Sequence, residues 1–154
     1  MRVKAIADDD EGVTDEVILD FSERSRRRSI FRTEGGQEIL LDQQRPSRIR
    51  GGQAFVLEDG SKVRIVARAE PLTSIRCESA GMLVRLAWHL GNRHLPTQIL
   101  ASSLGGELRI RTDHVIEDMA ARLGGRCARI EAVFDPEGGA YESGAPGHDH
   151  HGAH

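Results

Sequence analysis

Histidine side chains near the middle and at the end of the chain could bind a transition metal. His94 closes the run Trp88-His-Leu-Gly-Asn-Arg-His94. Further histidines occupy the end of the chain, at His148, His150, His151 and His154. Short histidine-rich tracts are typical of metal binding, and imidazole suits nickel, copper and zinc, whereas calcium and magnesium prefer oxygen ligands. An affinity tag is the alternative, but a tag is usually an unbroken run, and Asp149 interrupts this tract.

The residues around His94 predict that it lies on a short, stiff connection. Apolar residues recur before it at three- and four-residue spacing, namely Met82, Leu83, Leu86 and Leu90. This spacing predicts an amphipathic helix over residues 79–90. Gly91 is the expected left-handed C-cap, and Pro96 should force an extended chain into a strand over Thr97–Ala101. A loop histidine is most often only a solvated polar residue, but the histidine-bearing tail favours a metal ligand.

A second candidate ligand, His114, opens a helix expected over Asp113–Leu123. Thr112 or Asp113 is its expected N-cap, and Gly124 should end it. The helix dipole favours a neutral imidazole in the first turn, where it is available to a metal or a partner. The alternative is an exposed histidine without a role. His89, at the end of the preceding helix, is interpreted as structural.

The order of elements predicts an α+β protein with two domains and a tail. Residues 1–71 should form an all-β domain, a small barrel or sandwich, with strands over 13–21, 29–32, 38–41, 54–57 and 63–66. Asp59-Gly60 is a good hairpin signal between the last two. Residues 72–142 follow the order βαββαβ, which is the ferredoxin-like arrangement. Residues 143–154 are rich in glycine and histidine and should form a flexible tether.

Composition excludes several classes. The chain has 154 residues, 38% apolar and 29% charged, with a net charge of −3, so nothing in the total favours nucleic acid or a membrane surface. No apolar run approaches a membrane span or a signal peptide, which indicates a cytoplasmic protein. The two cysteines, Cys77 and Cys127, are expected to be buried free thiols. The acidic run Asp8–Gly12 is expected to be a turn, because it lacks the spacing of a calcium loop.

Several segments together resemble the urease accessory nickel metallochaperone family, commonly called UreE. The similarity lies in His89-Leu-Gly-Asn-Arg-His94-Leu-Pro-Thr-Gln98, in Asp113-His114-Val115, in Phe134-Asp-Pro-Glu-Gly-Gly-Ala-Tyr141 and in the histidine-bearing C-terminus. It covers residues 72–141 well, whereas the N-terminal half matches only in its β character and glycine-rich turns. The resemblance implies a homodimer that carries Ni²⁺ for urease maturation, with the essential histidine at His94 and a less essential one at His114.

The resemblance also implies partners: the urease accessory GTPase and apo-urease with its other accessory proteins. The chain contains no phosphate-binding loop and no motif of a catalytic nucleophile, so it is not expected to be an enzyme. Several family members have a histidine where this chain has Thr112, so an internal histidine pair is lost. The tail has only four histidines, which favours a small transient site over bulk storage.

Two alternatives stay open at this point. A general copper or zinc buffer would use the same ligands, and Zn²⁺ or Cu²⁺ should bind in vitro. An RNA-binding ferredoxin-like module would use the basic segment Arg24–Arg32, but the expected sheet strands lack the aromatic residues on which bases stack.

Overall fold

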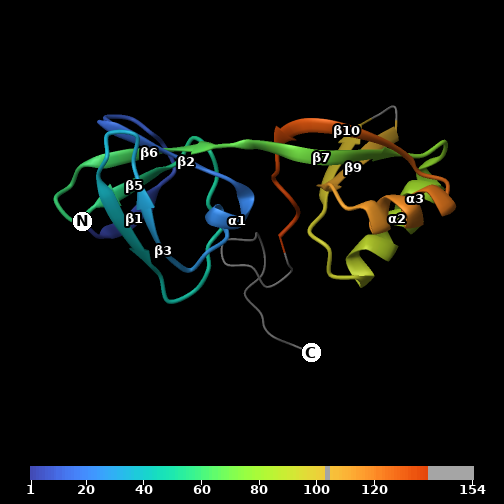
Figure 1. The fold of residues 1–154 in the computed structure, drawn as a ribbon, viewed down its shortest axis with the longest axis horizontal. Coiled ribbons are helices and arrows are strands. Elements are labelled where there is room, and N and C mark those ends of the chain that lie inside the picture. Colours follow the sequence, from blue (N-terminus) through green and yellow to red (C-terminus); the bar gives the residue numbers. More distant parts are fainter. Residues whose placement is uncertain (103–104, 139–154) are drawn as a thin grey trace. The chain divides into compact units, whose positions relative to one another are not determined.

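The computed structural model describes residues 1–102 and 105–138, and they form two compact units. Residues 1–68 make up the first unit and residues 69–137 the second. The chain passes between them where strand β6 (Lys62–Ala67) ends and strand β7 (Ala69–Arg76) begins, as Figure 1 shows. The predicted α+β class is confirmed. The histidines of the tail lie outside the described residues.

The first unit consists of two small β layers around one core, and all of its strand pairs but one are antiparallel. Its other elements are β1 (Val3–Ala7), β2 (Asp15–Leu19), α1 (Phe21–Arg24), β3 (Arg28–Arg32), β4 (Glu38–Asp42) and β5 (Ala54–Leu57). A four-stranded sheet has the order β1-β5-β6-β2, in which β2 and β6 are parallel, and β3 pairs with β4 in a separate hairpin. Phe31 of the hairpin stacks on Phe55 of the sheet at 6.0 Å, which joins the two layers.

Local signals explain two differences from the predicted strands. The strand expected over 13–21 ends at Leu19, because Asp20 caps the short helix α1. The Asp20 carboxylate accepts the Glu23 N–H at 2.8 Å, and the Glu23 carboxylate accepts the Asp20 N–H at 3.0 Å, which is a capping box. The hairpin at Asp59-Gly60 is confirmed, with Gly60 at a φ of +87°. Strand β1 was not predicted, because only Val3 of its residues is buried.

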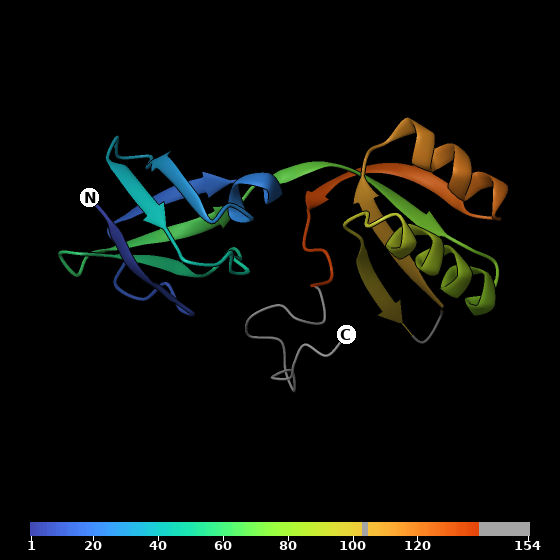
Figure 2. The ribbon, with the colours of Figure 1, turned by 90° about the horizontal axis from the view of Figure 1, so that it is seen from below.

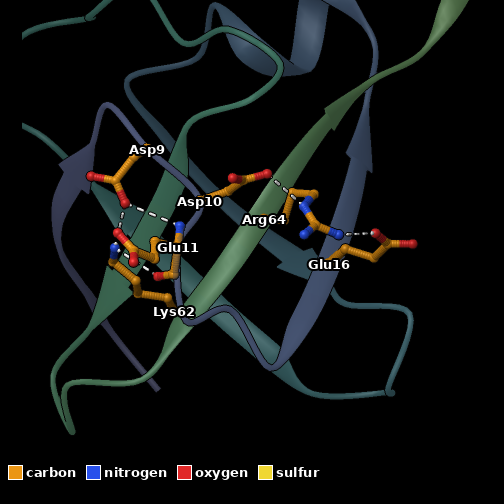
Figure 3. A network of polar contacts seen from close by, with 6 residues as sticks. All are labelled: Asp9, Asp10, Glu11, Glu16, Lys62 and Arg64. Atoms are coloured by element: carbon orange, nitrogen blue, oxygen red, sulfur yellow. Dashed lines mark hydrogen bonds and ion pairs between the residues drawn. The ribbon is translucent and has the colours of Figure 1, made fainter.

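The acidic run before β2 is held by two cations of β6. Figure 3 shows this network, which comprises Asp9, Asp10, Glu11, Glu16, Lys62 and Arg64. Lys62 Nζ lies 3.0 Å from Asp9 Oδ1 and donates at 3.0 Å to the carbonyl oxygen of Glu11. Arg64 Nε donates to Asp10 Oδ2 at 2.8 Å. The hydrogen bond from Lys62 lowers the pKa of Asp9. The segment is therefore an acidic turn in which Asp9 and Asp10 are paired with cations of β6.

The second unit has the predicted ferredoxin-like topology. Its elements after β7 are α2 (Ala80–Asn92), β8 (Gln98–Ser102), β9 (Gly105–Arg111), α3 (His114–Arg122) and β10 (Arg126–Val133). The sheet order is β10-β7-β9-β8, and all three strand pairs are antiparallel. The core between sheet and helices contains Ile75, Leu108 and Ile110 from strands and Leu86, Leu90, Ile116 and Ala120 from helices. Figure 2 shows both helices beside the sheet.

Side chains alternate along β9, so its charged residues lie on the face away from the helices. Leu108 and Ile110 are in the core, whereas Glu107 accepts hydrogen bonds from Ser74 Oγ at 2.7 Å, Arg76 at 2.8 Å and Arg109 at 2.9 Å. The middle of this face therefore carries a satisfied carboxylate, where an RNA-binding sheet would carry stacking aromatics.

The segment after β10 connects the two edges of the sheet. Phe134 is fully buried, the Asp135 N–H donates to Gln98 Oε1 at 3.2 Å, and the Glu137 N–H donates to the Thr97 carbonyl at 2.8 Å. The chain thus leaves β10 at one edge and is fastened to the start of β8 at the other. We call residues 134–137 the strap.

The cysteine prediction is correct in one part and wrong in another. Both thiols are free, but Cys77 is only partly buried and Cys127 is exposed. The reason is the position of β10, which is an edge strand and is covered incompletely by α3. Among residues 1–102 and 105–138, no helix combines the length and apolar character required to cross a membrane.

Candidate metal centre

Helix α2 presents His94 and is anchored by its cap and its buried stripe. The Ser79 hydroxyl accepts the Met82 N–H at 3.2 Å and caps the first turn. Leu86 and Leu90 are fully buried against the sheet. Burying one such leucine contributes about 1.5–3 kcal/mol, so this stripe fixes the direction in which the end of the helix points.

The predicted glycine cap of α2 is wrong, and His94 itself takes the left-handed conformation. Gly91 lies inside the helix, which continues to Asn92. His94 has a φ of +57° and is the one non-glycine residue with positive φ in the described part of the chain. Its N–H donates to the Gly91 carbonyl at 2.9 Å, and the Leu95 N–H donates to the Leu90 carbonyl at 3.2 Å. These two bonds define a Schellman motif with His94 at the position that glycine usually occupies.

Helix α3 ends in the same motif but follows the usual rule. Gly124 has a φ of +90°, its N–H donates to Ala121 at 3.2 Å, and the Gly125 N–H donates to Ala120 at 2.8 Å. The two helix ends of one unit therefore share the same hydrogen-bond pattern, but one has histidine and the other glycine at the left-handed position. Histidine is among the residues that tolerate this conformation, but glycine would adopt it without a steric cost. A side chain retained there against that cost motivates a functional hypothesis.

The His94 side chain is exposed and available. No hydrogen bond or ion pair of its imidazole occurs with any residue that the structure describes. The backbone after it is held firmly, because Thr97 Oγ1 donates to the Leu95 carbonyl at 3.0 Å and the strap bonds to Thr97. A fixed backbone and a free imidazole suit a metal ligand.

The outer face of α2 carries an apolar stripe that leads toward His94. Val84 is 68% exposed and Trp88, four residues later, is 63% exposed. The Trp88 ring lies edge-on to His89 at 5.1 Å, so His89 packs against a neighbour on its own helix. The low aromatic content predicts Trp88 as one of the few large residues that fill the core, and this prediction is wrong. The position of Trp88 off the buried stripe was a signal for its exposure.

His114 is the first residue of α3, and Asp113 is the N-cap. The Asp113 carboxylate accepts N–H groups of Val115 at 3.0 Å and Ile116 at 3.2 Å, so Thr112 is not the cap. The His114 side chain is 82% exposed, and its Nε2 lies 3.9 Å from Asp118 Oδ2. This carboxylate was not predicted, although its spacing of four residues on one helix was a readable signal.

One protomer does not assemble a complete transition-metal site from the described residues. Within residues 1–102 and 105–138, no group of three or more histidine, cysteine, aspartate or glutamate side chains could hold a metal ion. His94 and His114 are therefore presented singly. The other predicted ligands, His148, His150, His151 and His154, lie outside the described residues.

The fold and these side chains define a two-unit α+β protein whose ferredoxin-like unit presents single, exposed histidines. Comparison with known sequences then identifies the family. The N-terminal domain profile of the UreE urease accessory protein matches residues 2–68, and the C-terminal domain profile matches residues 70–154. The chain therefore belongs to the UreE family of urease accessory proteins.

Curated relatives agree with this assignment. The urease accessory protein UreE of Rhodopseudomonas palustris is 54% identical over 143 residues, which are 92% of this chain and 66% of the relative. Two Bradyrhizobium relatives of the same name are each 56% identical, over 92% and 91% of this chain and 68% and 64% of their own lengths. The chain thus spans about two thirds of the length of these relatives.

Proposed function

We propose that this chain is a nickel carrier for urease maturation, with a site built from His94 of two protomers. The observation that carries this proposal is the His94 imidazole, which is exposed, unpaired among the described residues and mounted on a rigid helix end. One imidazole cannot hold a transition metal alone. A two-fold axis doubles it, because an isologous interface brings the same residue of each chain together.

The exposed stripe on α2 supports such a homodimer. Val84 and Trp88 lie on the same face of the helix, about two to three turns before His94. Large apolar side chains exposed together mark an interaction surface more often than scattered ones do. Burying this stripe against a second copy would bring the two His94 loops close to the symmetry axis.

The strap supports a role for the tail. Glu137 is bonded to Thr97, and three residues span at most about 11 Å, so the strap ends near His94. His148 follows Glu137 by 11 residues. A glycine-rich tether of that length has a root-mean-square reach of roughly 18 Å, which is sufficient for a tail histidine to join the site. Tail ligands can leave one at a time, which suits a carrier that must release its cargo.

The chain has no motif for nucleotide hydrolysis, so the energy for delivery must come from a partner protein. We propose that the metal-binding domain, residues 72–142 with the tail 143–154, passes Ni²⁺ to the urease accessory GTPase and through it to apo-urease in the cytoplasm. Affinity alone does not select nickel, because copper binds nitrogen sites more tightly. Docking on the correct partner and metal availability would supply the selectivity.

Nickel titration calorimetry on the full chain tests this function. His94→Ala should lose the shared site, whereas His89→Ala, on the same helix, should retain it. Urease activation in cells should fall with His94→Ala and not with His89→Ala. Competition with Zn²⁺ and Cu²⁺ separates a nickel carrier from a general buffer. Unchanged nickel affinity in His94→Ala would refute the site, and normal urease activation without this protein would refute the carrier role.

A further inference from the structure

The two cysteines lie on the same face of two neighbouring strands. Cys127 of β10 is directly opposite Ile75 of β7, and Cys77 lies two residues after Ile75, just past the end of β7. Residues two apart share a face, and both Ile75 and Cys77 contact the core beneath the helices. Cys127 Sγ lies 3.9 Å from the Glu117 carbonyl of α3, so it faces the helices as well.

This relationship is diagonal, and its spacing suits a metal bridge better than a disulfide. Diagonal neighbours across an antiparallel pair have Cα atoms about 7–8 Å apart, beyond the roughly 6.8 Å that a disulfide normally spans. Both thiols are indeed free. Two metal–thiolate bonds of about 2.3 Å each allow the sulfurs to be up to about 4.6 Å apart. Side chains that lean toward each other from diagonal positions can meet that separation.

Charged groups around the two thiols act on their pKa values. Desolvation raises the pKa of Cys127, and Glu117 and then Cys77 raise it further. Desolvation also raises the pKa of Cys77, but Arg126 acts in the opposite direction. The Arg126 guanidinium is therefore within electrostatic reach of Cys77, where it would offset part of the charge of bound thiolates.

No third ligand is available near the pair. The Glu117 carboxylate already accepts hydrogen bonds from Thr73 at 2.5 Å and from Arg129 at 3.1 Å. The described residues contain no cluster of three or more metal-ligating side chains. Zinc prefers four ligands, so two sulfurs do not suit it. Monovalent copper is soft, favours thiolates and accepts two of them in a linear arrangement.

We propose that Cys77 and Cys127 form a two-coordinate thiolate site for Cu(I), separate from the nickel site. Each thiol loses its proton to solvent and each thiolate forms one bond to the ion, with no electron transferred. The complex carries one net negative charge, which Arg126 offsets. The exposed side of Cys127 gives the ion access. Helix α2, with 13 residues, is about 20 Å long and separates Cys77 from His94, so the two sites can be filled independently.

Competition for Cu(I) under anaerobic conditions tests this site. The protein is the full chain with its four tail histidines replaced by alanine. It is mixed with the coloured complex of Cu(I) and bicinchoninate in excess chelator, and loss of colour measures transfer of Cu(I) to the protein. One ion per chain should transfer. Cys77→Ser and Cys127→Ser should each weaken transfer by more than the roughly 10- to 100-fold that loss of an outer-shell partner costs. His94→Ala in the same background should leave it unchanged.

A second measurement does not depend on the folding of the serine variants. Iodoacetamide should alkylate Cys127 of the unsubstituted chain, and one equivalent of Cu(I) should protect both cysteines. If the cysteine variants took up Cu(I) as well as the chain that keeps both cysteines, the proposal would be overturned. Alkylation that Cu(I) does not slow, or one ion shared between two chains, would also overturn it.

Discussion

The N–H of His94 donates to the carbonyl of Gly91 at 2.9 Å while His94 itself has a φ of +57°. The residue that reverses the chain after α2 is therefore the residue proposed to bind nickel. The glycine expected to make this reversal lies one turn earlier, inside the helix. The helix end fixes the direction of a ligand at this position. The packing of the rest of the unit compensates the steric cost of a positive φ at a residue that has a side chain.

Replacing His94 separates stability from metal binding. His94→Gly should raise the free energy of unfolding by about 0.5–1 kcal/mol, because glycine adopts a positive φ without a steric cost but adds entropy to the unfolded chain. His94→Ala should stay close to the parent, since alanine is no better suited to this conformation. Urea denaturation followed by the fluorescence of Trp88 measures both. A His94→Gly variant less stable than the parent would contradict the left-handed assignment.

Trp88→Glu should convert the proposed dimer to a monomer and abolish the shared nickel site without unfolding the protein. A charge in the middle of the exposed α2 stripe cannot be buried against a second copy unless it is paired. Light scattering with and without nickel measures the mass. Ile30→Glu is the matched control, because Ile30 is 66% exposed on β3 of the other unit and should leave the mass unchanged. Equal effects of the two variants would argue against this interface.

His114→Ala should reduce nickel affinity less than His94→Ala does, by under about tenfold, or 1.4 kcal/mol. The His114 side chain is 82% exposed, and Thr112, two residues before it, offers no imidazole as a second ligand. Calorimetry on both single variants gives the comparison. Asp113→Ala serves as the structural counterpart, since loss of the N-cap should destabilise the protein by about 1 kcal/mol. A larger affinity loss in His114→Ala than in His94→Ala would reverse the proposed ranking.

Glu117 should make the stability of the second unit sensitive to acid. The hydrogen bond from Arg129, with a second from Thr73, holds the pKa of Glu117 below its ordinary value of 4.5. A lowered folded-state pKa contributes stability above the unfolded-state pKa, and this contribution is lost as the pH falls from about 4.5 through the folded-state value. Glu117→Gln should therefore be less stable than the parent by about 1–2 kcal/mol at neutral pH.

The same comparison in acid provides the control for Glu117. The stability difference between Glu117→Gln and the parent should shrink as the pH falls from about 4.5 through the folded-state pKa of Glu117, since both side chains are uncharged below that value. Denaturant unfolding at a series of pH values measures it. A difference that stays constant across this range would show that the ionised carboxylate is not the source of the stabilisation.

The sequence by itself determined the features that depend on residues close together in the chain. The spacing of apolar residues, with Thr112 or Asp113 as the expected N-cap of the second helix, defined both helices of the second unit to within two residues. The order of strands and helices determined the ferredoxin-like topology, because connections this short leave few arrangements. The position of His94 between a helix and a strand was equally readable, since Pro96 and the apolar stripe are local signals.

The tertiary structure decided what depends on contacts between distant residues. Packing of Leu90 and Leu95 extends α2 past Gly91 and moves the left-handed position to His94. Strand β1 forms only by pairing with β5, and the strap is recognisable only from its bonds to Thr97 and Gln98. Cys127 is exposed because β10 lies at the edge of the sheet. Local propensities are worth fractions of a kcal/mol per residue, whereas burial of one side chain is worth several times more, so packing determines these features.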